Sequence, residues 1–334
     1  MGIVNTEIKQ KTIKKAVSLV GVGLHTGKNV TLTFKPALAN TGLAFKRVDL
    51  EGMPVIEADA SYVTNTQRGT CLEKNGVTIQ TSEHVLAALV GMDVDNVILE
   101  LNASEPPIMD GSSKFFVKAI EDAGIVELDA FREEYIVTDV ISYTDEESGS
   151  EILVMPCKEY QITAMVDFGT KVLGTQNATL NKISDFKKDI SNARTFSFLH
   201  EIEMLLEHGL IKGGDLNNAI VYVDKALSPE TLEKLKIAFK KDSITIKPNG
   251  ILDNLTLHHP NEAARHKLLD VLGDLALIGT HIRGKVIATK PGHFVNTQFA
   301  KKMSKIIKNE RRNNVPNIDL NQTPLMDVNQ IMAM

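Results

Sequence analysis

The sequence predicts an α+β protein with two similar domains, each built from a layered β-sheet and helices. Its 334 residues, of which 43% are hydrophobic, are enough for two domains that each bury a core. Patterns typical of strands precede patterns typical of helices, and this order occurs twice along the chain. The charged residues from Glu127 to Glu133 are typical of a connector, so the expected domains are residues 1–128 and 134–310.

The first half begins with short strand patterns. Apolar and polar residues alternate over 30–35, which indicates a strand that buries one face. Thr81 or Ser82 is suited to cap a helix that runs to Gly91. A turn at 110–113 then opens a second helix that stops near Gly124. Further strands are expected at residues 42–48, 68–74, 77–81 and 96–102.

The second half repeats this order of elements. Its strands are expected at residues 135–143, 151–155, 161–166, 219–223 and 285–289. Its helices are expected at residues 186–191, 200–208, 229–241, 261–278 and 295–309. Residues 311–334 are polar and irregular, so we expect them to form a tail.

Composition excludes several classes of protein. A net charge of −5 gives no reason to expect nucleic-acid binding. The only cysteines, Cys71 and Cys157, do not make a disulfide framework and fit a reducing compartment. The polar, basic residues from Met1 to Lys15 are unlike a signal peptide. No apolar run approaches the ~18–20 residues of a membrane span, so we expect a soluble, cytoplasmic protein.

The helix expected at 261–278 carries an unusual polar face. His266, Asp270 and Asp274 are spaced four residues apart, so they project from one side of the helix. A solvated helix face usually carries Lys and Glu, whereas an imidazole followed by carboxylates is typical of a zinc site. The spacing therefore favours metal binding by this helix and leaves an ordinary polar face as the alternative.

A second polar pair opens the apolar helix that follows Ser82. Glu83 is favoured by the helix N-terminus, but a protonated His84 is not, and a neutral, metal-bound His84 would resolve this conflict. Catalytic zinc sites usually have three protein ligands and one open position for water. The pair could therefore complete a zinc site with the later helix, although ordinary helix capping explains the same residues.

These two helices belong to a series of motifs that occur in one order along residues 8–305. The motifs are Gly21-Val-Gly-Leu-His-Thr-Gly27, Ala39-Asn-Thr-Gly42, Thr81-Ser-Glu-His84, Pro107-Ile-Met-Asp-Gly-Ser112, Ala193-Arg-Thr-Phe196, Gly209 with Gly213-Gly214, Arg265-His-Lys-Leu-Leu-Asp270, Gly273-Asp274 and Gly292-His293. In this series the chain resembles the UDP-3-O-acyl-N-acetylglucosamine deacetylases, zinc amidases that commit cells to lipid A synthesis. The resemblance implies two layered domains with the active site between them.

The resemblance also implies a set of residue roles. The zinc ligands would be His84, His266 and Asp270. Glu83 would be the general base for the attacking water, and His293, supported in its charged form by Asp274, would be the general acid. The substrate would be UDP-3-O-(3-hydroxyacyl)-N-acetylglucosamine, and the products its 2-amino derivative and acetate. Without the resemblance, His293 is equally well explained as a turn histidine after a Pro-Gly pair.

Further residues would contact the substrate. The resemblance implies that Thr195 helps to hold the oxyanion, that Phe196 packs on the sugar and that Lys267 meets the diphosphate. Residues 199–221 match an insert that forms a passage for the acyl chain, although apolar residues there equally fit ordinary helix packing. The expected lining residues of this passage are Leu199, Ile202, Gly214, Ala219 and Val221.

Two segments depart from the simpler members of this family. Residues 225–259 form an extra insertion of unassigned role. Residues 327–334 resemble the start of a 3-hydroxyacyl-[acyl-carrier-protein] dehydratase, so we expect the chain to be the deacetylase part of a fusion with that enzyme. The deacetylase part is expected to be monomeric, and the intact fusion to form oligomers through its dehydratase domain.

Other interpretations stay open at the level of sequence. Two histidines and one carboxylate also accept ferrous iron, Fe2+, in place of zinc, Zn2+. A nucleotide-sugar binding module with a structural metal is a second interpretation, although a structural zinc normally has four protein ligands. A scaffold for a fused dehydratase with a vestigial metal site is a third, and the full set of polar site residues argues against it.

Overall fold

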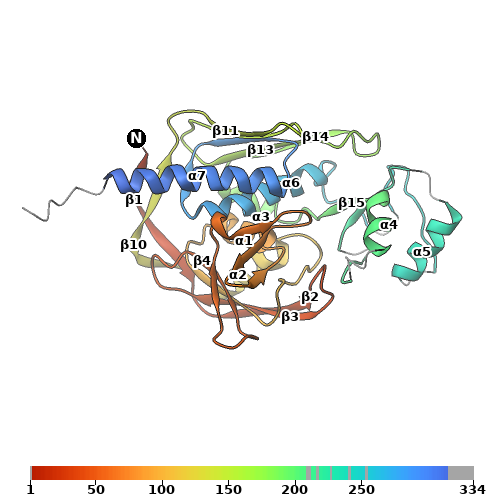
Figure 1. The fold of residues 1–334 in the computed structure, drawn as a ribbon, viewed down its shortest axis with the longest axis horizontal. Helices are drawn as coiled ribbons and strands as arrows, with labels where there is room; N and C mark the ends of the chain where they lie inside the picture. The colour runs from red at the N-terminus through yellow and green to blue at the C-terminus, as the bar shows by residue number, and fades with distance from the viewer. Residues whose placement is uncertain are drawn as a thin grey trace, which may run out of the picture.

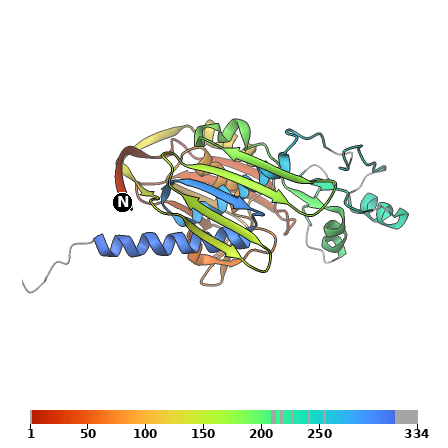
Figure 2. The same cartoon turned by 90° about the horizontal axis from the view of Figure 1, so that it is seen from above.

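Two five-stranded sheets enclose a layer of helices in the computed structural model (Figures 1 and 2). The structure describes residues 2–207, 212–215, 218–225, 228–239, 242–252 and 255–314. The predicted tail lies outside these residues except for its first four positions, which continue the last helix. The motif at 327–334 also lies outside the described part.

The first sheet has the strand order β2-β3-β9-β4-β5. Its strands are β2 (Val17–Val22), β3 (Asn29–Pro36), β4 (Leu43–Arg47), β5 (Val55–Glu57) and β9 (Val97–Leu101). Val30, Leu32 and Phe34 are fully buried on β3, so the predicted alternation is confirmed. Only β4 and β9 run parallel among the neighbours in this described sheet.

The second sheet repeats this arrangement strand by strand, with the order β11-β12-β18-β13-β14. Its strands are β11 (Ile141–Asp145), β12 (Ser150–Met155), β13 (Gln161–Asp167), β14 (Thr175–Leu180) and β18 (Lys285–Thr289). Here β13 and β18 form the parallel pair. Each sheet therefore takes four consecutive strands and inserts a later fifth one in its middle, which confirms two similar layered α+β halves.

One helix precedes and another follows the inserted strand in each half. They are α1 (Glu83–Gly91) and α2 (Lys114–Ala123) around β9, and α6 (Glu262–Leu275) and α7 (His293–Asn314) around β18. The helices α1 and α6 cross in the middle of the molecule (Figure 1). A Cβ atom on Gly273 would lie 2.1 Å from the carbonyl oxygen of Glu83, so a glycine is required at the crossing. This close approach brings the polar residues of both helices together.

The predicted connector at 127–133 is wrong. These residues lie in the strand β10 (Ile125–Ile136), which pairs antiparallel with β1 (Ile3–Ile13) and parallel with β17 (His281–Arg283). Exposed and half-buried residues alternate along β10, so its charges fit a strand with one solvated face. The strand predicted over 135–143 is in fact the end of β10 and the start of β11.

Smaller elements surround the helix crossing. A three-stranded sheet contains β6 (Val63–Asn65), β7 (Cys71–Lys74) and β8 (Val77–Ile79). The elements between the second sheet and α6 are α3 (Phe186–Asp189), β15 (Phe196–Phe198), α4 (Leu199–Glu207), β16 (Ile220–Tyr222) and α5 (Pro229–Phe239). Both α4 and α5 project from the body of the molecule beside β15 (Figure 1).

Candidate active site

Six polar side chains from three helices meet at the crossing of α1 and α6. Glu83 and His84 begin α1, and His293 begins α7. The face of α6 that was predicted from its four-residue spacing supplies the other three, which are His266, Asp270 and Asp274. The six form two adjoining groups, one of His84, His266 and Asp270 and one of Glu83, Asp274 and His293.

The first group has the spacing of metal ligands. The Nε2 atoms of His84 and His266 lie 3.6 and 3.3 Å from Oδ1 of Asp270. Zinc bonds of about 2.0 Å in a tetrahedron separate two ligand atoms by about 3.3 Å. Oδ1 of Asp270 is buried and accepts no hydrogen bond within the described part of the chain. A buried carboxylate oxygen without a hydrogen bond is costly, and a cation at this position would satisfy it, so the residues fit a zinc ion.

Protonation also favours metal binding by this group. Burial lowers the pKa of His266 to about 4, so its ring is neutral near pH 7. Nδ1 of His266 lies 3.1 Å from the carbonyl oxygen of Ala193, which fixes the proton there and leaves the Nε2 lone pair for a metal. Burial opposes ionisation of Asp270, but the neighbouring His266 ring and the ammonium of Lys267 prevail and hold the pKa of this carboxyl well below its usual range.

The second group is an ion pair next to a buried carboxylate. Nδ1 of His293 lies 3.0 Å from Oδ2 of Asp274, and its Nε2 lies 3.9 Å from Oε1 of Glu83. Burial by itself lowers the pKa of His293, but the charges of Asp274 and Glu83 outweigh it and raise this pKa to about 9. For the carboxyl of Glu83, burial has the opposite effect and raises the pKa. The group therefore combines a charged imidazole with a carboxylate that binds a proton more readily than usual.

Two further residues orient this group, and the sequence analysis missed both. The backbone N–H of Thr70 donates to Oε2 of Glu83 across 2.9 Å, and its hydroxyl donates to Asp274. Asn296 donates through Nδ2 to Oδ2 of Asp274, also across 2.9 Å. Asn296 follows His293 by three residues on α7, a spacing that could have identified it. Thr70 lies in a loop, and no sequence pattern singles it out.

A cavity of about 250 Å³ opens onto both groups. Thr195 and Phe196 line it, and so does Lys267, whose Nζ lies 2.9 Å from Oδ2 of Asp270 and 5.7 Å from the centre of the Phe196 ring. Asp274 and Leu199 do not line this cavity, because both are fully buried behind it. Of the residues expected to form an acyl passage, the cavity wall contains Ile202, Gly214, Ala219 and Val221.

Comparison with known proteins identifies the family. The family model for UDP-3-O-acyl N-acetylglycosamine deacetylase (LpxC) matches residues 10–236 and 231–305. The chain belongs to this deacetylase family. It is 45% identical over 324 residues to the bifunctional enzyme LpxC/FabZ of Bacteroides thetaiotaomicron, an alignment that covers 97% of this chain and 70% of that protein.

Other relatives carry the deacetylase name alone. The UDP-3-O-acyl-N-acetylglucosamine deacetylase of Myxococcus xanthus is 37% identical over 295 residues, which covers 88% of this chain and 86% of the relative. The protein of the same name from Saccharophagus degradans is 39% identical over 306 residues, which covers 91% of both chains. The LpxC family thus includes both single and bifunctional proteins, and this chain aligns with both kinds.

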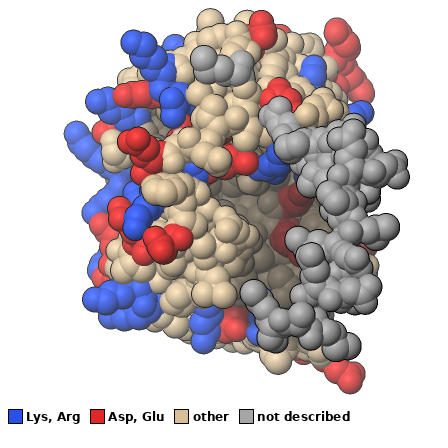
Figure 3. All heavy atoms as spheres, turned by 90° about the vertical axis from the view of Figure 1, so that its left-hand side faces the viewer, with Lys and Arg blue, Asp and Glu red and all other residues tan. Residues whose placement is uncertain are grey.

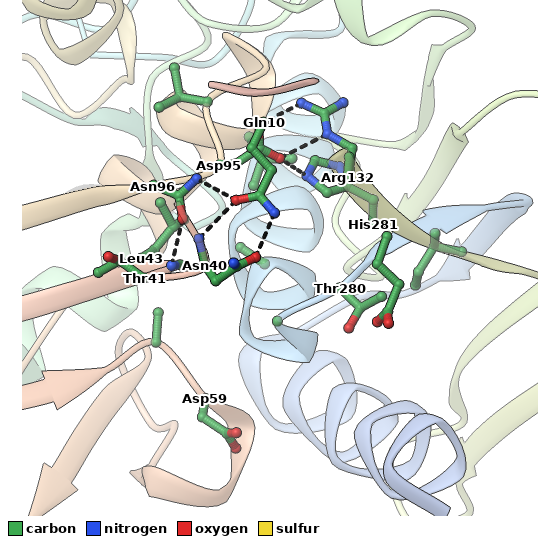
Figure 4. Close-up of a pocket in the computed structure, with 18 of the residues that line it drawn as sticks. Gln10, Asn40, Thr41, Leu43, Asp59, Asp95, Asn96, Arg132, Thr280 and His281 are labelled. Carbon is green, nitrogen blue, oxygen red and sulfur yellow. Dashed lines mark hydrogen bonds and ion pairs between the residues drawn. The ribbon is translucent and has the colours of Figure 1, made fainter. Parts of the chain in front are cut away.

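This LpxC-family chain has a second cavity, of about 470 Å³, between its two halves at the other end of α1 and α6. One face of the molecule is hollowed there, and acidic and basic side chains both gather around the hollow (Figure 3). Its labelled polar residues bond mainly to one another: Gln10 to Asn40 and Asn96, and Asp95 to Arg132 and His281 (Figure 4). These bonds connect β1, β10 and β17 to the segment at Asp95 and Asn96 and indicate a structural role.

No helix in the described ranges combines the length and the apolar composition that crossing a membrane requires. The longest of them, α7, instead has buried residues such as Phe299 and Met303 on one side. Its other side carries lysines and arginines, several of which pair with carboxylates elsewhere in the chain.

Proposed function

We propose that this protein is a zinc-dependent deacetylase that hydrolyses the 2-acetamido group of UDP-3-O-(3-hydroxyacyl)-N-acetylglucosamine. The products would be acetate and UDP-3-O-(3-hydroxyacyl)-glucosamine, the committed step of lipid A synthesis. One observation carries this proposal: a ligand set for a metal ion adjoins a carboxylate and a charged imidazole in one cavity. Membership of the deacetylase family and the names of the relatives support the choice of reaction.

The metal would be held by His84, His266 and Asp270. Zinc, when bound, draws electron density from a carbonyl oxygen and makes water acidic enough to lose a proton near pH 7. The same three ligands also accept ferrous iron, so the preference for zinc is part of the proposal.

Glu83 and His293 would move the protons. A carboxylate in the position of Glu83 takes a proton from the attacking water, and its raised pKa makes it a stronger base than an exposed glutamate. His293 is charged below about pH 9, so it can give a proton to the amine nitrogen as the C–N bond breaks. Asp274 and Asn296 would keep the ring of His293 charged and oriented.

The wall of the cavity would position the substrate. The hydroxyl of Thr195 would support the oxyanion, the ring of Phe196 would pack on the sugar and the ammonium of Lys267 would meet the diphosphate. The ammonium of Lys267 donates a hydrogen bond to Asp270, and both residues line the cavity, so a group bound by Lys267 would lie close to the proposed metal site. The apolar wall at Ile202 and Val221 would accept the acyl chain.

A nucleotide-sugar binding module with a structural metal is the second candidate. Metal analysis and an acetate-release assay on the same preparation separate the two functions. The proposed deacetylase binds one zinc ion per chain and releases acetate from UDP-3-O-(3-hydroxyacyl)-N-acetylglucosamine. One bound zinc ion without acetate release would instead favour the binding module.

The setting of this activity is also a proposal. We infer that the chain works in the cytoplasm and that its deacetylase part is monomeric. The chain covers 70% of two bifunctional relatives, whose name includes FabZ. This coverage supports the proposal that a dehydratase is fused to the deacetylase. The intact protein would then form oligomers through its dehydratase domain.

A further inference from the structure

A second, smaller hydrophobic core, separate from the main one, includes residues of α4 and α5. Its five buried members are Leu199, Ile202, Val221, Leu235 and Leu252. Leu235 comes from α5 and Leu252 from the segment that follows it, so both belong to the extra insertion at 225–259. The insertion therefore packs directly on residues of the expected acyl passage.

Two residues of this small core also form the wall of the catalytic cavity. Ile202 and Val221 line the cavity on one side and pack with Leu235 and Leu252 on the other. Leu235 is fully buried in this contact. Leu235 and Leu252 do not line the cavity themselves, so the insertion supports this part of the wall from behind.

Backbone hydrogen bonds attach the insertion to the same wall. The N–H of Leu252 donates to the carbonyl oxygen of Val221 across 3.1 Å, and that of Val223 donates to Gly250 across 2.8 Å. Between them, Tyr222 and Ile251 form an antiparallel bridge. Since β16 also pairs with β15, the insertion adds a third extended segment beside β16, and β16 separates it from the strand that carries Phe196.

We propose that the insertion tunes the acyl-chain selectivity of this enzyme, with Leu235 and Leu252 as positioning residues behind Ile202 and Val221. This inference rests on the proposed deacetylase function. When an acyl chain occupies the cavity, the side chains of Ile202 and Val221 are packed on both sides, and close packing resists their displacement. Each methylene of an acyl chain that is buried against such a wall contributes about fourfold to binding, from about 0.8 kcal/mol per methylene.

The test compares a substrate that reaches the wall with one that does not. The two substrates are UDP-3-O-(3-hydroxytetradecanoyl)-N-acetylglucosamine and UDP-3-O-acetyl-N-acetylglucosamine, and the readout is the ratio of their kcat/KM values. The variants are Leu235→Ala, which empties the space behind the wall, and Leu252→Val, which removes one methylene. Leu235→Met preserves the volume, and Ile237→Ala is the matched control because Ile237, on the same helix, is 78% exposed.

We expect Leu235→Ala to lower the long-to-short ratio about tenfold and Leu252→Val to lower it about fourfold, on the scale of one to two methylenes. Leu235→Met and Ile237→Ala should stay within about twofold of the unmodified protein, since volume-conserving and surface changes cost little. An unchanged ratio in both core variants would overturn the proposal. An equal loss on both substrates would also overturn it, because a general structural defect has that signature.

A binding measurement separates this inference from the proposed reaction. Titration calorimetry with 3-hydroxytetradecanoic acid needs no turnover, and its affinity should fall in Leu235→Ala but not in Ile237→Ala. If the unmodified protein released no acetate but this pattern held, the reaction would be wrong and the role of the insertion would stand. Affinity that is equal in both variants would refute the role of the insertion whether or not acetate is released.

Discussion

Nδ1 of His293 lies 3.0 Å from Oδ2 of Asp274, so an ion pair joins the first residue of α7 to the last turn of α6. Asp274 is fully buried and also accepts hydrogen bonds from Thr70 and Asn296. The carboxylate is therefore held in place, and its charge maintains the proton on His293. This relationship makes the charge state of the proposed general acid depend on a residue that does not line the cavity.

Replacing this carboxylate should move the pH dependence of the reaction. His293 is protonated below its pKa of about 9, so activity that needs the acid is present at neutral pH and is lost as the pH rises through about 9. In Asp274→Asn, burial lowers this pKa without the opposing charge of Asp274. The alkaline limb of the kcat/KM profile, which reports the free enzyme, should then move down by about 1 pH unit or more.

The pH-rate profiles of Asp274→Asn and a control variant check this prediction. Asp129→Asn is a suitable control because Asp129 is a fully exposed carboxylate on β10, far from the site in the fold. The control should keep the original alkaline limb. An alkaline limb that stays in place in Asp274→Asn would show that Asp274 does not support the charge of His293.

Removing a proposed ligand should remove the metal. His266→Ala deletes one of three ligands, so bound zinc and activity should both be lost. Metal content is measured by elemental analysis after dialysis. His259→Ala, a partly buried histidine just before α6, should keep both properties. Retention of stoichiometric zinc by His266→Ala would contradict the ligand assignment.

A buried ion pair beside the site should contribute strongly to the free energy of unfolding. Nε of Arg194 lies 2.8 Å from Oε1 of Glu262, and both side chains are almost completely buried. Glu262→Ala leaves the guanidinium buried without this partner and should lower the free energy of unfolding by about 3–5 kcal/mol. Urea unfolding measures the loss. Glu230→Ala on α5 should cost less than about 0.5 kcal/mol, because its ion pair with Lys234 is exposed.

The crossing of α1 and α6 should tolerate no added methyl group. The Cβ atom of Gly273→Ala would lie 2.1 Å from the backbone oxygen of Glu83, so the helices would have to separate. We expect a destabilisation of about 1–3 kcal/mol or more, as in overpacked cores, visible as a lower melting temperature. Gly292→Ala is the matched control, since no atom lies within 4 Å of its added Cβ. Equal melting temperatures for Gly273→Ala and Gly292→Ala would mean that the two helices can separate without loss of stability.

Periodicity predicted the parts of the fold in which one face of an element is buried. The spacing along α6 and the alternation along β3 both match the burial that the structure shows. Periodicity failed for β1 and β10, which pair with one another along a partly solvated face. Their charged and polar side chains are typical of loops. The backbone hydrogen bonds that pair the two strands do not depend on side-chain type, so the sequence pattern does not reveal them.

In the candidate site, too, some residues could be predicted from the sequence and others could not. The face of α6 identified His266 and Asp270 as a pair. The first turn of the helix after Ser82 offered Glu83 and His84 as candidates to complete the site, but only the family resemblance gave each residue a role. Long-range neighbours such as Thr70 need the fold to be known, because 204 residues separate it from Asp274. The proposed role of Leu235 also needed the fold, since its place in one buried core with Val221 depends on how the insertion returns along β16.

Acetate release and metal content of Glu83→Gln, measured on one preparation, test the central claim most directly. Glu83 adjoins the proposed metal ligands but belongs to the proton-transfer group. The variant should bind one zinc ion per chain, as the unmodified protein should, and should release acetate about 10²–10⁴-fold more slowly, the usual contribution of a general base. Turnover at the unmodified rate with full zinc would contradict the account.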